Sequence, residues 1–510
     1  MDIRDKSRRG FLAKSALGLA GLSLLPSTVF AAEKKGRLDK SLIPSPVMDG
    51  DNKLVELYWK AWELAWEKVK YQDGMPQSPY MDEGLWDHTV WIWDTAFMVH
   101  FCKYSPKQYP GIESFDNFYT VMHGTNTASL KIHHPDNPPL FAWIENDYAR
   151  FTGNTDRFKH ILTEKKYLQK HYDYFENTKP HTKFKYAGAH TNIKKEEIGF
   201  RWWGVQSGMD NTPRGRGVGY GNIYWIDAIA QQGLAALNIS RIAETIGDKA
   251  TAKEYKAKYK VFKDLVNKYY WDEEDGMYYD INVEAPYEKV KVKTPASFWP
   301  MLAEMCDKKQ AAKLEQAALK HFGGDIPWPT VSADDPDFHE SGCYWKGGVW
   351  LPTAYMATKA LEKYGYHETA DKLSLNLVKH MRATYDQFEP HTIWECYNPT
   401  KPIPATHGGD NGYSREDFCG WSALGPISML IENVLGFHDV DAIKKEVRWR
   451  LHRSDRHGIK DLRFGDIKTS VIADGDTVEV ESDGEYKLYI NGKKHKVKKG
   501  KQTFKIRRQV

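Results

Sequence analysis

The sequence predicts a mainly α-helical fold in which paired helices close into a ring, followed by a small C-terminal β-domain. Between residues 52 and 436, apolar side chains recur at spacings of three and four, the period of an amphipathic helix, and Gly- or Pro-rich connections separate the runs. The runs come in adjacent pairs, and such pairs can form inner helices wrapped by outer ones. After residue 437 the pattern changes to short alternating strands.

The helical domain is assigned to residues 33–436, and its pairing is clearest in the middle of the chain. Residues 221–247 carry an apolar stripe that includes Ile226, Ile229 and Leu234, and Gly247 supplies a stop. A second run, 250–270, follows at once. Two further pairs join residues 298–305 to 309–321 and residues 349–364 to 367–385.

The C-terminal domain, residues 437–510, is expected to be a small sandwich-like β-domain. Residues 478–481 alternate Val and Glu, and residues 486–490 form a second strand, followed by the hairpin turn Asn491–Gly492. The lysines near the end, including Lys498 and Lys499, are interpreted as solvated strand faces, with a glycan-binding surface as the alternative.

Composition narrows the class of partner. The 510 residues include 72 basic and 68 acidic side chains, so the formal charge is only +4. This balance gives no reason to expect nucleic acid or an anionic membrane as a partner. Aromatic residues make up 13% of the chain, with 18 Trp and 29 Tyr, which suits a cleft that stacks flat rings on sugars.

The N-terminus resembles a twin-arginine export signal, assigned to residues 1–31. Arg8 and Arg9 precede an apolar run over residues 16–30, which contains Pro26 and is shorter than the roughly 20 residues that a membrane-spanning helix needs. A membrane anchor is the alternative. No other stretch is long enough to span a bilayer, so we expect a periplasmic or otherwise exported protein without a membrane span. The five cysteines form no Cys-x-x-Cys pair, which makes a structural zinc site unlikely to be encoded.

Three segments that are rich in Trp, Asp, His and Gly, residues 201–219, 327–348 and 390–420, are the expected functional loops. Cleavage of a glycosidic bond needs two carboxyl groups, one to protonate the leaving oxygen and one to activate water or attack carbon. Asp210 lies between Gly208 and Pro213, and a helix cap or turn is the alternative for it. Glu395 lies among aromatic residues, and a structural salt bridge is its alternative.

Four segments of the chain form a set of motifs: Trp91–Phe97, Ser207–Arg214, Tyr344–Pro352, and Trp394–Pro399 followed by Gly420–Leu424. In the same order along the chain, they resemble the motifs of glycoside hydrolase family 63, the glucosidase branch of the (α/α)6-barrel hydrolases, with trehalases as more distant relatives. The resemblance implies an (α/α)6 toroid catalytic barrel. It also implies an exo-acting, inverting hydrolase that removes a non-reducing-end, α-linked, glucose-like sugar from an oligosaccharide or glycan; mannose, galactose and rhamnose remain open.

The resemblance also implies residue roles. Asp210 matches the general acid and Glu395 the general base, and inversion requires their carboxyl groups to lie roughly 6.5 to 9.5 Å apart. Asp94 matches a residue that holds sugar hydroxyls, with a buried helix-start acid as the alternative. The remaining substrate-binding candidates, several of which could equally be core residues, are Trp93, Trp203, Arg214, Trp345, Lys346, Trp350 and Trp421.

Departures from the family pattern put the identity of the sugar in doubt. Lys346 and Gly348 stand where the family often has Arg and Pro, and the insert at residues 407–417 is either a substrate loop or a connection. Helices begin soon after the signal, so the N-terminal β-domain of many relatives is not expected. The same barrel also carries polysaccharide lyases, sugar epimerases and phosphorolytic enzymes, and a non-catalytic glycan-binding protein is a further alternative.

No cofactor or catalytic metal is expected. The acidic stretch at residues 272–280 invites a structural calcium site, but it lacks the terminal Glu of a twelve-residue calcium loop, and a tight turn after a helix is the preferred interpretation. The oligomeric state is not predicted.

Overall fold

The computed structural model describes residues 36–506, apart from Leu85 and residues 409–411. The expected export signal lies outside the described residues. The described residues from Leu38 onward form one compact unit. Within the described part of the chain, every helix is too short or too polar to cross a membrane.

Six helical segments form a closed inner ring in this unit. They are α3 (Ile92–Cys102), α5 (Phe141–Thr152), α9 (Ile226–Thr245), α11 (Trp299–Leu302), α13 (Leu351–Lys363) and the consecutive segments η7 (Trp421–Leu424) and η8 (Gly425–Val434). Each contacts the next, and η7 contacts α3, so the ring closes. Every residue of α3 is buried, as expected for a helix surrounded by protein. The predicted (α/α)6 toroid is confirmed.

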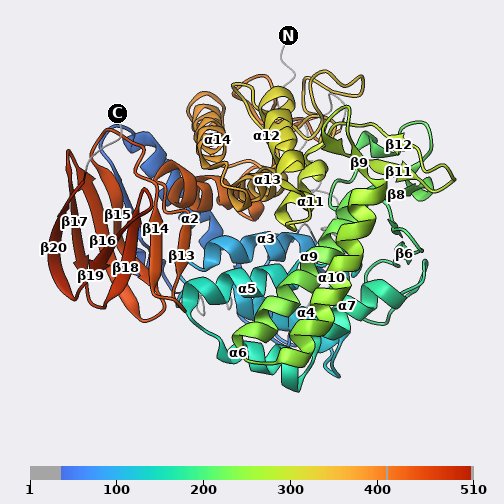
Figure 1. Ribbon diagram of the computed structural model, residues 1–510, viewed down its shortest axis with the longest axis horizontal. Coiled ribbons are helices and arrows are strands. Elements are labelled where there is room, and N and C mark those ends of the chain that lie inside the picture. The colour runs from blue at the N-terminus through green and yellow to red at the C-terminus, as the bar shows by residue number, and fades with distance from the viewer. Residues whose placement is uncertain (1–35, 85, 409–411, 507–510) are drawn as a thin grey trace, which may run out of the picture. The chain divides into compact units, whose positions relative to one another are not determined.

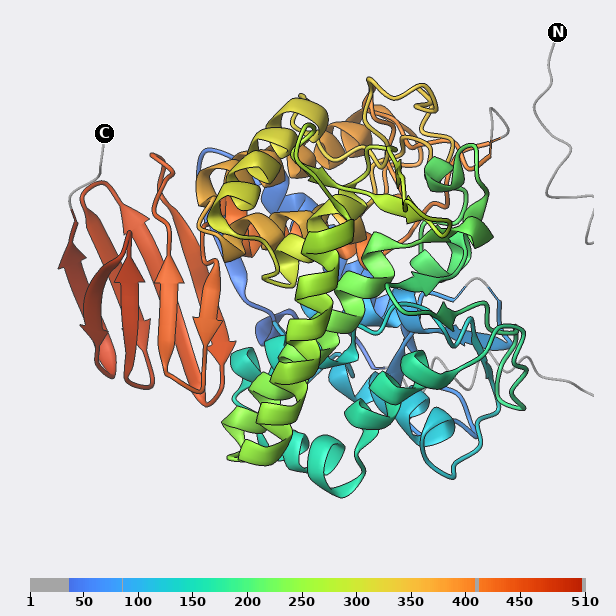
Figure 2. The ribbon, with the colours of Figure 1, turned by 45° about the vertical axis from the view of Figure 1, so that its right-hand side comes forward.

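Outer helices cover this ring (Figures 1 and 2). They are α2 (Asn52–Glu67), α4 (Asp116–Met122), α7 (Tyr167–Asn177), α10 (Lys249–Tyr269), α12 (Lys308–Phe322) and α14 (His367–Gln387). Helix α10 packs along α9 and buries one stripe, which includes Tyr255, Phe262 and Val266, so it has the amphipathic pattern of an outer helix. Short helices α6 (Asp156–Phe158) and α8 (Gly204–Ser207) lie in connections.

The predicted helix pairs are present, but several helices begin or end at other residues than predicted. Helix α9 begins at Ile226 rather than near residue 221, because Ile223–Tyr224 forms strand β8, which pairs with β11 (Asp280–Asn282). Helix α11 ends at Leu302, earlier than residue 305. Helix α12 begins after Asp307, whose side chain forms a capping box with Gln310.

The other short strands of the helical part form small two- and three-stranded pairings. These strands are β2 (Val69–Lys70), β3 (Tyr80–Met81), β4 (Thr89–Trp91), β5 (Lys131–His133), β6 (Lys194–Lys195), β7 (Phe200–Arg201), β9 (Trp271–Asp272), β10 (Met277–Tyr278) and β12 (Lys289–Val290). The acidic stretch considered for calcium forms the turn between β9 and β10, directly after α10. There Lys291 Nζ lies 3.0 Å from a carboxylate oxygen of both Asp272 and Asp275.

The C-terminal strands gather into two sheets beside the helices (Figure 1). One has the order β1-β15-β16-β17-β20 and the other β13-β14-β18-β19. Their bounds are β1 (Ser45–Met48), β13 (Asp439–Asp441), β14 (Glu446–Trp449), β15 (His457–Phe464), β16 (Ile467–Asp474), β17 (Thr477–Ser482), β18 (Tyr486–Ile490), β19 (Lys493–Val497) and β20 (Gly500–Lys505).

Two features of these sheets bear on the sequence analysis. The predicted hairpin joins β18 to β19, and Asn491 and Gly492 have φ of 46° and 80°, as a type I′ turn requires. Strand β1 was not predicted. It comes from the N-terminal part of the chain and pairs antiparallel with β15, so the β-domain includes residues from before the barrel. Arg150 on α5 joins the barrel to β13 through Asp439 and Asp441.

Candidate active site

The four motif segments each lead into an inner helix. Residues 89–91 precede α3, residues 208–225 precede α9, residues 343–350 precede α13, and residues 394–420 precede η7. Direct contacts described below join these segments. The arrangement therefore gathers residues that lie more than 300 positions apart at one set of inner-helix N-termini.

The loop that carries Asp210 is fixed on two sides. Gly208 ends α8 with φ of 76°, and a Cβ built there would lie 2.7 Å from the ring of Trp93, so only glycine allows this close approach. On the other side, Asn211 Nδ2 donates to the carbonyl oxygen of Cys343 at 3.0 Å, and Asn211 Oδ1 accepts from the backbone N–H of Trp345 at 2.8 Å. Asp210 is thus held between α3 and the segment before α13.

Asp210 is an exposed residue, yet many protein atoms surround its carboxyl group. The resulting desolvation, together with the negative charge of Glu395, raises the pKa of Asp210 from 3.8 to about 6. A carboxyl group with this pKa keeps a proton at mildly acidic pH and can act as a general acid.

Glu395 is 1% exposed and is held by three groups. Tyr344 Oη donates to Oε1 at 3.3 Å, and Arg415 contacts both oxygens, with Nη2 donating to Oε1 at 3.3 Å and its backbone N–H to Oε2 at 3.2 Å. The carbonyl oxygen of Glu395 accepts from Trp421 Nε1 at 3.1 Å. The buried carboxylate therefore has a fixed orientation and a neighbouring positive charge.

Asp94 lies in the first turn of α3 and is 7% exposed. Burial, followed by the negative charge of Asp82, raises the pKa of Asp94 well above its usual value, while Arg415 opposes the shift. Asp82 and Glu83 are themselves buried, and burial raises the pKa of each to about 7. With pKa values of about 7, Asp82 and Glu83 are partly protonated near neutral pH and can donate as well as accept hydrogen bonds.

Sequence reasoning did not assign Asp82, Glu83 or Arg415 to the site. The two acids lie about ten positions before Asp94, and their adjacency followed by Gly84 was a usable signal. Arg415 belongs to the insert that was left undecided, and no local pattern indicates that it contacts Glu395.

The predicted aromatic residues have different positions. Trp345 and Trp350 stack with centroids 3.9 Å apart and are buried, and Trp421 lies 5.6 Å from Trp350 at 44°. Trp93 is 5% exposed, and its buried Nε1 has no hydrogen-bond partner within the described chain. Trp203 is 49% exposed. The stacked rings of Trp345 and Trp350 therefore lie in the protein interior, whereas about half of the Trp203 side chain is exposed to solvent.

Lys346 and Arg214 differ sharply in environment. Lys346 lines an open pocket of about 320 Å³ together with Asn211, Tyr220 and Asp337, and none of the described carboxylates lies within 4.0 Å of its ammonium group. Arg214 is 1% exposed, and its guanidinium donates to both oxygens of Asp280 and to Asp227. The substrate-binding role expected for Arg214 stays a prediction, and three of its hydrogen bonds go to buried carboxylates.

Comparison with known proteins identifies the family. Residues 93–413, more than half of the chain, match the model of the mannosylglycerate hydrolase MGH1-like glycoside hydrolase domain. The chain belongs to this glycoside hydrolase family. The matched MGH1-like region contains both Asp210 and Glu395 and ends before Arg415. Within the described residues no group of three His, Cys, Asp or Glu side chains is arranged to hold a metal ion.

Two proteins of known sequence are similar to this MGH1-like chain. A Borreliella burgdorferi protein of unassigned activity is 27% identical over 480 residues, covering 89% of this chain and 95% of its own length. Periplasmic trehalase of Escherichia coli is 27% identical over 193 residues, but this covers 38% of the chain and only 32% of the trehalase.

Solved structures support the fold. The family 63 mannosylglycerate hydrolase from Thermus thermophilus superposes with a TM-score of 0.54 at 16% identity, covering 73% of this chain and 99% of that one. Neutral trehalase from Saccharomyces cerevisiae gives a TM-score of 0.52 at 16% identity, covering 71% and 76%. A chain described as a sialidase gives 0.67 at 13% identity, covering 90% of this chain but 41% of the other.

Proposed function

We propose that this glycoside hydrolase is exo-acting and inverting, and that it removes a non-reducing-end sugar with Asp210 as general acid and Glu395 as general base. The observation that carries the proposal is the pairing of two carboxyl groups in different environments. Asp210 is an exposed residue whose pKa is raised to about 6, and Glu395, whose charge contributes to that shift, is buried against Arg415. Two carboxyl groups with divided roles are what glycoside hydrolysis requires.

In this mechanism Asp210 donates its proton to the glycosidic oxygen as the bond to the anomeric carbon breaks. Glu395 removes a proton from a water molecule, whose oxygen attacks the anomeric carbon from the opposite face. Tyr344 and Arg415 orient the Glu395 carboxylate toward that water. The free sugar leaves with the inverted configuration, Glu395 carries the proton, and exchange with solvent restores both groups.

The acidic cluster around Asp94 supports the binding of a neutral sugar in the subsite before the cleaved bond. Burial raises the pKa of Asp94 and so favours its protonated form, and a protonated carboxyl group can donate to one sugar oxygen while accepting from a hydroxyl. Trp93 beside it supplies an apolar ring and an unpaired Nε1–H. Both groups lie at the start of α3, next to the Asp210 loop.

The leaving group is proposed to lie toward the pocket that contains Lys346. This pocket includes Asn211, the neighbour of the general acid, and it is open to solvent. The relatives suggest two kinds of substrate: a trehalase acts on a neutral disaccharide, and a mannosylglycerate hydrolase on a glycoside of glycerate. Lys346 favours a carboxylate-bearing leaving group, because no described carboxylate lies within 4.0 Å of its ammonium group.

The test is release of monosaccharide from a panel that contains trehalose, other α-glucosides, mannosides and glycosides of glycerate. Asp210→Asn should lower kcat/KM by about 10²- to 10⁴-fold on a natural substrate. The loss should be much smaller on a nitrophenyl glycoside, whose leaving group needs no proton. Asp264→Asn, at an exposed position on α10, is the matched control and should retain activity. Equal losses on both substrates would remove Asp210 from the acid role.

We further propose that the protein is exported. The twin-arginine-like N-terminus supports this, as does the similarity to a periplasmic trehalase. The double variant Arg8→Lys, Arg9→Lys should retain the protein in the cytoplasmic fraction of a bacterial host. Unchanged export of that variant would refute the signal assignment.

A further inference from the structure

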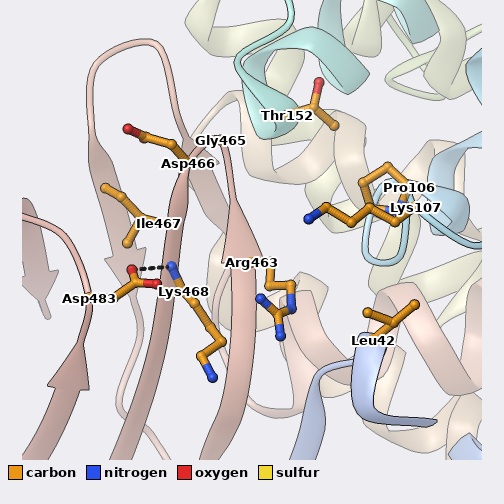
Figure 3. A pocket seen from close by; sticks show the side chains of 10 residues that line it. All are labelled: Leu42, Pro106, Lys107, Thr152, Arg463, Gly465, Asp466, Ile467, Lys468 and Asp483. Carbon is orange, nitrogen blue, oxygen red and sulfur yellow. Dashed lines mark hydrogen bonds between the residues drawn. The ribbon is translucent and has the colours of Figure 1, made fainter. Parts of the chain in front are cut away.

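A second cavity, of about 170 Å³, lies outside the active site (Figure 3). Its walls come from the loop after α3, the C-terminal end of α5, the segment η1 (Lys40–Leu42) and the hairpin of β15 and β16. It shares no residue with the four segments that form the candidate active site. Any ligand of this cavity therefore has a separate binding site.

Three cations and two carboxylates line this cavity, and only part of the charge is balanced. Lys468 Nζ lies 3.4 Å from Asp461, and Asp483 accepts the backbone N–H of Lys468 at 2.7 Å. Asp466 is 82% exposed and lies 3.9 Å from Lys445.

The two remaining cations, Lys107 and Arg463, have no carboxylate within 4.0 Å in the described part of the chain. Arg463 Nε is also buried without a hydrogen-bond partner among the described residues. Figure 3 shows the two side chains extending from opposite walls into the same gap.

This arrangement is unfavourable when only protein is considered. Two like charges that face one cavity repel each other, and a buried donor without a partner loses the hydrogen bond that it made with water. An anion between the two walls would offset the repulsion between the cations and accept the hydrogen bond of the unpaired donor. The planar fork of an arginine suits two oxygens of one phosphate or carboxylate, while a lysine adds a point charge.

The cavity volume limits the ligand. A cavity of about 150 Å³ holds one benzene molecule, so a space of similar size takes a small oxyanion or the acidic end of a sugar, but not a stretch of glycan. The lining combines the apolar side chains of Leu42, Pro106 and Ile467 with the charged side chains of Lys107, Arg463 and Lys468.

We propose that this cavity binds a small oxyanion, a phosphate group or a sugar carboxylate, between Lys107 and Arg463. The bound anion would link the loop after α3 to strand β15 and so fasten the β-domain to the barrel. A ligand that binds only the folded state raises the melting temperature.

The test is calorimetric titration of the full chain with inorganic phosphate, glucose 6-phosphate, glucuronate and glucose at matched ionic strength, together with melting curves. We expect saturable binding of at least one anion, no binding of glucose at this cavity, and a higher melting temperature in the presence of that anion. Binding of phosphate and glucose 6-phosphate alone would indicate a phosphate site, and binding of glucuronate would indicate a sugar-acid site.

Variants localise the binding. Arg463→Met should weaken anion binding at least tenfold, and Lys107→Met, in an exposed loop, gives a second test if the first variant is poorly folded. Lys372→Met, at an exposed position on α14, is the matched control and should bind like the original protein. Absence of anion binding, or equal binding by the Arg463 and Lys372 variants, would overturn the proposal. The enzyme can release sugar whether or not an anion binds at this cavity, so the binding test is independent of the proposed hydrolase function.

Discussion

Replacing Arg214 by Met should destabilise the protein far more than the same change at Arg216. Both arginines lie in the loop before α9, and each contacts two aspartates. Arg214 is paired with Asp227 and Asp280, and the three side chains are between 1% and 3% exposed. Arg216 is 34% exposed; of its two partners, Asp337 is 39% exposed and Asp335 is 4% exposed. The pair of variants therefore compares one chemical change at a fully buried arginine and at an arginine that solvent reaches.

The magnitude follows from what each change leaves behind. Arg214→Met leaves two buried carboxylates without their counter-charge, and breaking one buried pair costs about 3 to 5 kcal/mol. Exposed pairs contribute about 0 to 1 kcal/mol, which sets the expected loss for Arg216→Met. With an unfolding entropy of about 2.1 cal/mol/K per residue, a chain of this length loses roughly 1 °C of melting temperature per kcal/mol.

The assay is thermal unfolding at neutral pH, followed by circular dichroism or calorimetry, with KM measured on the best substrate. We expect the melting temperature to fall by about 3 to 5 °C for Arg214→Met and by at most about 1 °C for Arg216→Met. Equal melting temperatures for the two variants would refute the reasoning. A normal melting temperature with a strongly raised KM for Arg214→Met would support the substrate-binding role expected from the sequence.

Three other outcomes follow from the site. Because Asp210 must be protonated to act as general acid and its pKa is raised to about 6, kcat/KM should fall as pH rises through about 6; a profile flat to pH 8 would contradict this. Because the pKa of Asp210 is about 6 in the folded protein and 3.8 in its ordinary state, ionisation of Asp210 lowers the stability of the folded protein as pH rises from about 4 to 6. Asp210→Asn should therefore raise the melting temperature at pH 8 and leave it nearly unchanged below pH 4. Arg415→Met should lower kcat about 10- to 150-fold, which corresponds to the loss of one hydrogen bond to a charged group, and should change KM little. Arg415→Lys should recover part of the activity. A change in KM alone would assign Arg415 to substrate binding instead.

The sequence predicted most of the barrel because its signals are local. The three- and four-residue spacing located the pairs around α9 and α13, and the turn at Asn491–Gly492 located a hairpin, since both patterns depend on neighbouring residues. The start of α9 was placed too early because Ile223 and Tyr224 pair with a strand almost 60 positions away. Strand β1 was missed for the same reason, since its partner β15 is more than 400 positions further along the chain.

The residues of the candidate site also fall into those that local motifs indicate and those that only tertiary contacts bring together. Asp210, Glu395 and Asp94 stand in compact motifs, so a resemblance carried by those motifs indicated them. Arg415 and the pair Asp82–Glu83 reach the site through tertiary contacts that no local spacing encodes. Arg214 shows the opposite case, because this motif position near Asp210 lies at the centre of a buried ion triad.

The measurement that tests the central claim most directly is the configuration of the sugar at the moment of release, followed by NMR during hydrolysis of an α-linked substrate. The account predicts that the β-anomer appears first and that Glu395→Gln abolishes its formation at unchanged folding. Initial release of the α-anomer, or undiminished activity in Glu395→Gln, would contradict the assignment of Glu395 as the base of an inverting hydrolase.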